Sequence, residues 1–160
     1  MTRPIVFMCV VLAPLLGHAA EEGPAALCAQ ARDDDTVRRY DPSLRAGLLR
    51  AYAHLFPQAR MPPNEQDFQV GAHIRCMDGR LWTCFTGANL PCAKMNTALD
   101  NKGAEAFCQT NPDAPFVPAF ATGHDSIYSY RCVAGRPEIS GETFRVDARG
   151  FAANLWALVE

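Results

Sequence analysis

The chain has 160 residues, of which 49% are hydrophobic and 20% charged, so it has the length and composition of one folded domain rather than of a disordered or fibrous protein. Its 15 basic and 17 acidic side chains nearly balance, which excludes the strong positive field of a domain that binds nucleic acid or anionic lipid. Seven cysteines are the unusual feature of the composition.

The first twenty residues have the pattern of a secretory signal peptide. A positive charge precedes an apolar run from Ile5 to Leu16, and small residues follow it, so we expect cleavage after Ala19 or Ala20. Twelve helical residues span about 18 Å, well short of the ~30 Å hydrocarbon core, so the run is too short for a membrane anchor. We therefore expect a periplasmic or secreted protein in which segment 1–20 is removed and residues 21–160 form a single disulfide-stabilised domain.

Six cysteines remain once the signal peptide and its Cys9 are removed. An even number of cysteines in an exported chain predicts three disulfide bonds. A zinc site is the competing use, but the chain has neither a C-x-x-C pair nor a histidine pair at ligand spacing. The predicted disulfide cysteines are Cys28, Cys76, Cys84, Cys92, Cys108 and Cys132.

The first half of the mature chain predicts an irregular segment, a helix and a strand. Residues 21–41 contain glycine, proline and an acidic run, and predict irregular structure. Asp41 can cap a helix that begins at Pro42, and apolar residues then recur at helical spacing, which predicts a helix over 42–56. The opposite side of that helix, with Arg45, Arg50 and His54, is expected to face solvent. Strict alternation of apolar and polar residues over 68–76 predicts a half-buried strand.

A hairpin is expected next. Asp78-Gly79 is a favoured pair for a two-residue turn, so residues 80–86 should form the returning strand. Because side chains alternate between the faces of a sheet, this register places Cys76 and Cys84 on opposite faces, and they should not bond to each other. A disulfide-bonded Cys84 beside Trp82 requires that the second face of the sheet be covered as well.

The turn-rich segment 87–125 is the expected cover of that second face. It contains a short predicted helix over 103–109, followed by prolines that keep the chain extended. An irregular stretch of this length is unusual in a compact domain unless it is tethered. We therefore predict a disulfide between Cys92 and Cys108.

A second hairpin is predicted from strands 127–133 and 139–146. Its turn region and that of the first hairpin both read R-C-x-x-G-R, which indicates two similar hairpins of one antiparallel sheet. Asp147 then predicts the start of a final helix over 150–158. The expected fold class is α+β: a small antiparallel sheet of two β-hairpins with N-terminal and C-terminal helices and three disulfides.

Two loops contain the polar residues most suggestive of a site. His124 and Asp125 lie between an extended segment and a strand, where binding residues often occur. His124 can serve as a base, but adjacent residues do not easily share one imidazole hydrogen bond, and no nucleophile motif accompanies them. Asn89 and Lys94 belong to a glycine-containing loop. We predict that these four residues bind a ligand and that the chain has no catalytic residue; an ordinary turn is the alternative in both loops.

Other possible sites are less specific. The scattered histidines and methionines of an exported chain would suit copper, but their spacing predicts no metal and no cofactor. Trp82, Tyr128 and Tyr130 form either an aromatic platform for a sugar or peptide, or part of the core.

Several motifs together resemble a known group of proteins. They are R-C-x-D-G at 75–79, G-A-N-L-P-C-x-K at 87–94, T-G-H-D at 122–125 and D-x-R-G-F at 147–151. This set resembles small exported bacterial Cys-rich proteins for which no function is established. The resemblance covers roughly residues 68–160, implies a whole-domain unit in the periplasm, and supplies no catalytic residue. The Y-R-C-x-x-G sequence of the second hairpin is also similar to that of small periplasmic lysozyme inhibitors.

These observations predict a non-enzymatic binding or interaction protein. Its partner is expected to be a small molecule or a protein, not nucleic acid, and no membrane anchor should remain after signal cleavage. The alternatives are an inhibitor of a secreted hydrolase such as lysozyme, or a small hydrolase that uses His124.

Overall fold

The computed structural model describes residues 23–87 and 90–160, so the expected signal peptide and Asn89 lie outside the described part of the chain. One set of elements comprises α1 (Pro24–Ala31), β1 (Asp34–Arg39), the 3-10 turn η1 (Pro42–Leu44), α2 (Arg45–Leu55), α3 (Glu65–Gly71), β2 (Ala72–Met77), β3 (Arg80–Phe85), the 3-10 turn η2 (Ala153–Leu155) and β6 (Trp156–Leu158). A second set comprises α4 (Lys102–Thr110), α5 (Ala119–Thr122), β4 (Tyr128–Val133) and β5 (Arg136–Glu142).

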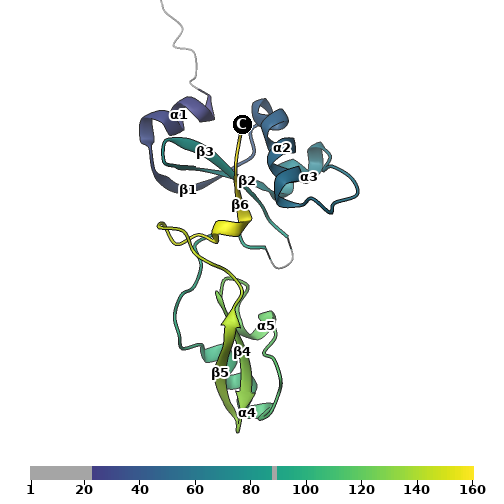
Figure 1. Ribbon diagram of the computed structural model, residues 1–160, viewed down its shortest axis with the longest axis vertical. Helices are drawn as coiled ribbons and strands as arrows, with labels where there is room; N and C mark the ends of the chain where they lie inside the picture. The colour runs from purple at the N-terminus through teal and green to yellow at the C-terminus, as the bar shows by residue number, and fades with distance from the viewer. Residues whose placement is uncertain (1–22, 88–89) are drawn as a thin grey trace, which may run out of the picture.

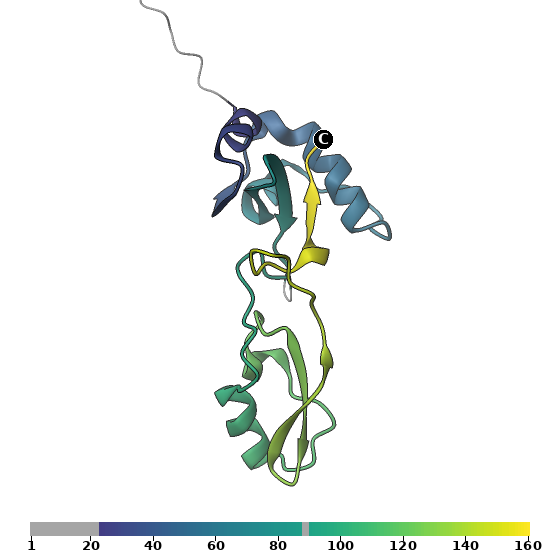
Figure 2. The same ribbon diagram turned by 60° about the vertical axis from the view of Figure 1, so that its left-hand side comes forward.

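The two sets form two lobes stacked along the long axis of the molecule (Figure 1). The first lobe contains a four-stranded antiparallel sheet in the order β1-β2-β3-β6, and the second contains the hairpin β4-β5. The view in Figure 2 shows the chain passing between the lobes twice. The predicted α+β class, with helices, antiparallel sheets and three disulfides, is confirmed, although the two hairpins lie in separate sheets rather than in one.

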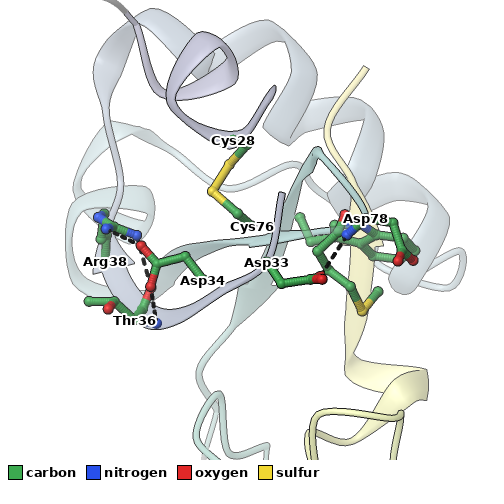
Figure 3. The surroundings of a disulfide bond; sticks show 9 residues. Cys28, Asp33, Asp34, Thr36, Arg38, Cys76 and Asp78 are labelled. Carbon is green, nitrogen blue, oxygen red and sulfur yellow. Dashed lines mark hydrogen bonds and ion pairs between the residues drawn. A yellow bond between two sulfur atoms is a disulfide. The ribbon is translucent and has the colours of Figure 1, made fainter. Parts of the chain in front are cut away.

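The segment predicted to be irregular, 21–41, instead provides α1 and the edge strand β1. The local sequence does not predict α1 or β1, because α1 depends on contacts with a distant part of the chain. Its buried residue Cys28 is bonded to Cys76 of β2. The backbone N–H of Asp78 donates to a carboxylate oxygen of Asp33 at 3.0 Å (Figure 3). The backbone N–H of Gly79 donates to the carbonyl of Arg32 at 2.8 Å. The acidic run therefore begins a strand fixed to the first hairpin turn, and is not a free loop.

The predicted helix over 42–56 is confirmed as η1 followed by α2. The Asp41 carboxylate accepts a hydrogen bond from the backbone N–H of Ser43 at 2.9 Å, and Pro42 occupies the first helical position. Leu48 of α2 is buried with Phe85 of β3, so this helix packs on the face of the sheet that also carries the Cys28–Cys76 disulfide.

The predicted strand over 68–76 is only half correct. Residues up to Gly71 form α3, and the strand β2 begins at Ala72. The cause is a capping box: Asn64 and Asp67 each accept a hydrogen bond from the other's backbone N–H, at 3.0 and 2.8 Å. The cap starts a helix whose one buried residue, Phe68, also fits the alternating pattern of a strand.

The predicted register of the first hairpin is confirmed. Met77 lies opposite Arg80, and the turn residues Asp78 and Gly79 have positive φ angles of 54° and 72°. The three disulfides join Cys28 to Cys76, Cys84 to Cys92, and Cys108 to Cys132. The two hairpin cysteines are therefore not bonded to each other, as strand parity requires.

The predicted Cys92–Cys108 disulfide is wrong. Cys92 lies across the second face of the main sheet, where Cys84 projects, and both belong to one buried cluster. Cys108 is in α4 (predicted as 103–109 and confirmed), and α4 packs on the second hairpin, where Cys132 meets it. The two cysteines of the rejected pair thus belong to the cores of different lobes.

The predicted C-terminal helix over 150–158 is replaced by η2 and β6. Asp147 caps a turn instead of a helix, because its carboxylate accepts from the backbone N–H groups of Arg149 and Phe151 at 2.8 and 3.0 Å. Beyond this turn, β6 pairs with β3, with Trp156 opposite Cys84. The end of the chain therefore covers the second face together with Met95 and its neighbours, so the predicted cover, 87–125, supplies only part of it.

Candidate functional site

A groove separates α2 from β6 in the first lobe. Its volume is about 370 Å³, within the range of small-ligand pockets. The residues that give it chemical character are Arg50, His54, Trp82, Trp156, Leu158 and Glu160.

The helical wall of the groove is set by spacing along α2. Arg50 and His54 are four residues apart, so they lie on one face of the helix. Close approach of the helix to the end of the chain depends on Gly47, since a Cβ atom there would lie 2.6 Å from Cγ1 of Val159. Buried Ala51, one turn further along, also lines the groove. The small residues Gly47 and Ala51 therefore allow α2, which carries Arg50 and His54, to lie close to the sheet.

The aromatic wall comes from two neighbouring strands. Trp82 of β3 lies opposite Leu158, and Trp156 of β6 lies opposite Cys84, so the two indoles project from the same face of the sheet. The Trp82 indole donates to the carbonyl of Met77 at 3.2 Å, which orients its ring. These are the only two tryptophans in the sequence, and both line the groove.

A buried arginine lies behind the aromatic wall. The guanidinium carbon of Arg75 is 4.7 Å from the centre of the Trp156 ring and 4.1 Å from that of Phe151, and Arg75 forms an ion pair with Asp147. The Phe151 and Trp156 rings meet edge to face, with centroids 5.7 Å apart. The Trp156 indole is consequently held in place by the Arg75 guanidinium, by the Phe151 ring and by the pairing of β6 with β3.

The charge on the helical side of the groove is not neutralised. Arg50 and His54 are exposed, and neither side chain forms an ion pair or a hydrogen bond with any other residue in 23–87 or 90–160. The one side-chain carboxylate among the residues that line the groove, that of Glu160, lies 3.7 Å from the guanidinium of Arg80. The groove therefore offers an unpaired cation, the partly exposed ring of Trp82 and the edge of the largely buried Trp156.

The polar residues singled out in the sequence lie elsewhere. His124 and Asp125 are exposed in the turn after α5, and His124 lines a hollow of about 140 Å³ in the second lobe with Ser129 and Thr143. Those two hydroxyls bond to each other at 2.8 Å. Across the described residues, no hydrogen bond links His124 to a hydroxyl or a carboxylate, so the structure shows no preformed catalytic pair there.

Lys94 belongs to an ion-pair cluster on the first lobe. Its ammonium lies 2.7 Å from Asp35, whose other carboxylate oxygen is 2.8 Å from Nε of Arg149. These hydrogen bonds, that from Arg149 first, lower the pKa of Asp35 to about 2. Among the described residues, His124 lines the hollow of the second lobe and Lys94 does not, although Asn96 N–H donates to the carbonyl of Asp125 at 2.8 Å.

The groove cannot be recognised from the sequence, because the residues that line its two sides are far apart in the chain. The basic pair of α2 has the pattern of an ordinary solvent-facing side, and Trp156 belongs to an apolar stripe that predicts a helix. Trp82 is the exception, since its position among strand residues already suggested an aromatic platform. Only the pairing of β6 with β3 brings these residues together.

Within residues 23–87 and 90–160, no helix is long and apolar enough to span a bilayer. In the same part of the chain, no three side chains among the histidines, cysteines, aspartates and glutamates come together as a metal site would require. No protein-family model, curated protein or solved structure matches the chain.

Proposed function

We propose that this protein is an exported, non-enzymatic binding protein of the periplasm or extracellular space, and that the groove between α2 and β6 is its ligand site. The observation that carries the proposal is the convergence of both tryptophans and an unpaired arginine on one cavity of about 370 Å³. Three disulfides support the compartment, since they persist in oxidising environments.

The chemistry of the groove supports binding. Indole rings provide rigid apolar surface for a flat or extended ligand, and a guanidinium provides paired donors for a carboxylate. His54 has no hydroxyl and no orienting carboxylate within hydrogen-bonding distance among the described residues, whereas a catalytic histidine requires such partners. The site therefore suits ligand binding through apolar contacts and one charged group, the guanidinium of Arg50.

Titration of the oxidised protein followed by ¹H–¹⁵N NMR tests the proposal. The probes are glucuronic acid, phenylacetate and a short acidic peptide, which combine a carboxylate with a ring, an aromatic group or an extended backbone. We expect at least one probe to shift both indole N–H signals saturably, and the double variant R50A/H54A to lose that response. Shifts confined to the second lobe, or no shift with any probe, would overturn the proposal.

A further inference from the structure

The strand that borders the groove has a free edge. β6 is the last strand in the order β1-β2-β3-β6. Val159 N–H donates to the carbonyl of Leu81 at 2.9 Å, and N–H groups along an antiparallel strand alternate between its two sides. The backbone groups of Trp156 and Leu158 therefore point away from β3, and no hydrogen bond found within 23–87 and 90–160 uses them.

This free edge lies along the cavity. Trp156, Ala157 and Leu158 line the groove from the strand side, and Ala51 lines it from the helix. Three residues of an added strand span about 10 Å, which is the length of β6. The groove thus presents a short row of backbone donors and acceptors of the kind that binds an extended peptide by strand addition.

The two faces of such an added strand would meet different surroundings. Trp82 and Trp156 project from one face of the sheet, whereas α2 packs on the other face, where Leu48 contacts the cluster that includes Val159. Side chains of an extended peptide alternate between these faces. Residues on the first face would contact Trp82 and Leu158, which are partly exposed, and residues on the second would approach Arg50.

The charge of Arg50 determines which peptide side chains would suit the face of the sheet on which α2 packs. Arg50 has no carboxylate partner among the described residues, and the carboxylate of Glu160 is already 3.7 Å from Arg80. An unpaired guanidinium favours a carboxylate, with which it forms two parallel hydrogen bonds. A peptide with basic side chains would instead place like charges next to each other.

We infer that the ligand of this groove is an extended peptide segment with alternating apolar and acidic residues, which joins the sheet as a fifth strand beside β6. This inference rests on the proposed function, and it names the ligand class of that same site. Backbone pairing with Trp156 and Leu158 supplies the register, the partly exposed side chains of Trp82 and Leu158 receive the apolar side chains, and Arg50 with His54 receives the acidic ones.

The experiment uses the oxidised chain and the peptide acetyl-Val-Glu-Val-Glu-Val-Glu-amide, with tryptophan fluorescence as the readout. We expect saturable binding that weakens at least tenfold in R50A. The matched control R39A removes an exposed arginine from β1 at the opposite edge of the same sheet and should leave binding unchanged. The Val-Lys analogue and the block peptide Val-Val-Val-Glu-Glu-Glu should bind at least tenfold more weakly.

Backbone methylation tests strand addition directly. Methylating alternate peptide nitrogens blocks one edge of a strand and leaves the other edge intact, so one of the two methylated series should lose binding and the other should retain it. Equal behaviour of the two series would overturn strand addition. Concentration-dependent dimers that bury the tryptophans would also overturn the inference, because a second copy would then be the occupant.

The control with glucuronic acid separates the two proposals. If glucuronic acid shifts the indole signals but the peptide does not bind, the groove is a ligand site and the peptide inference fails. If glucuronic acid, phenylacetate and the acidic peptides all produce no response at the indoles, the proposed function fails as well.

Discussion

The guanidinium of Arg75 and the carboxylate of Asp147 form an ion pair on the buried second face of the main sheet. Arg75 is 0% exposed, and Asp147 also accepts hydrogen bonds from the turn that precedes β6. One carboxylate therefore fixes both a buried cation of β2 and the path of the chain as it returns from the second lobe. The Trp156 wall of the groove depends on this arrangement.

The first prediction concerns that carboxylate. Asp147→Asn leaves the buried guanidinium of Arg75 without a counter-charge, and breaking a buried pair in this way costs about 3 kcal/mol or more. We expect urea denaturation of the oxidised variant to show this loss in the free energy of unfolding. Asp100→Asn, a matched change at an exposed carboxylate, should alter stability by no more than about 0.5 kcal/mol. Equal stabilities of the two variants would contradict a stabilising role for the pair.

The second prediction ranks the disulfides. The bonded cysteines are 48 residues apart in Cys28–Cys76, 24 residues apart in Cys108–Cys132 and 8 residues apart in Cys84–Cys92. Because a crosslink stabilises mainly by restricting the unfolded chain, removal of each pair by alanine should cost about 4, 3.5 and 2.5 kcal/mol in that order. Urea denaturation of the three double variants measures the ranking.

Peptide mapping without reduction provides the control for these disulfide variants. The wild-type protein should release three linked peptide pairs that match the observed connectivity. A Cys92–Cys108 linkage, or a larger loss of stability on removing the shortest loop than on removing the longest, would contradict the ranking.

The parts of the fold that follow from local chemistry could be read from the sequence. The Asp78-Gly79 turn determines the register of the first hairpin, and Asp41-Pro42 determines where the helix that becomes α2 begins. Alternation alone misassigned residues 68–71, because the capping box of Asn64 favours a helix whose single buried residue also suits a strand.

The remaining features depend on contacts between distant segments. Trp156 and its neighbours form a strand only because β3 offers an edge to pair with, and helical periodicity cannot reveal that edge. Cysteine pairing likewise depends on which lobe contains each partner. The candidate groove could not be predicted for the same reason, because it depends on the pairing of β6 with β3 and because Arg50 and Trp156 are more than a hundred residues apart in the chain.

The third prediction is a loss of stability in acid. Hydrogen bonds from Arg149 and Lys94 hold the pKa of Asp35 at about 2, below its value of 3.8 in an unfolded chain, and a hydrogen bond from Arg38 does the same for Asp34. Between these pH values the unfolded state binds more protons, so stability is full above pH 5 and falls as the pH falls toward 2. Each partly exposed group should contribute no more than about 1 kcal/mol.

Unfolding of the oxidised protein between pH 6 and 2 tests this dependence. Asp35→Asn removes one of the carboxylates whose pKa is lowered by hydrogen bonds in the folded protein, so the variant should lose less stability than the wild type over that range. The matched variant Asp100→Asn should retain the wild-type slope. An unchanged slope in Asp35→Asn would show that the bonds from Lys94 and Arg149 do not persist in solution.

The last prediction concerns the turn of the second hairpin. Ala134 has a φ angle of 48°, in the left-handed region that disfavours most side chains, at the position that corresponds to Asp78 (φ 54°) in the first hairpin. Asparagine and aspartate tolerate this conformation better than alanine and favour this turn type. We expect Ala134→Asn to stabilise the protein by about 0.5–1 kcal/mol, and Asp78→Ala to destabilise it by a similar amount. If urea denaturation shows the same sign for both changes, the two turns do not share the conformation that their R-C-x-x-G-R sequences and backbone angles indicate.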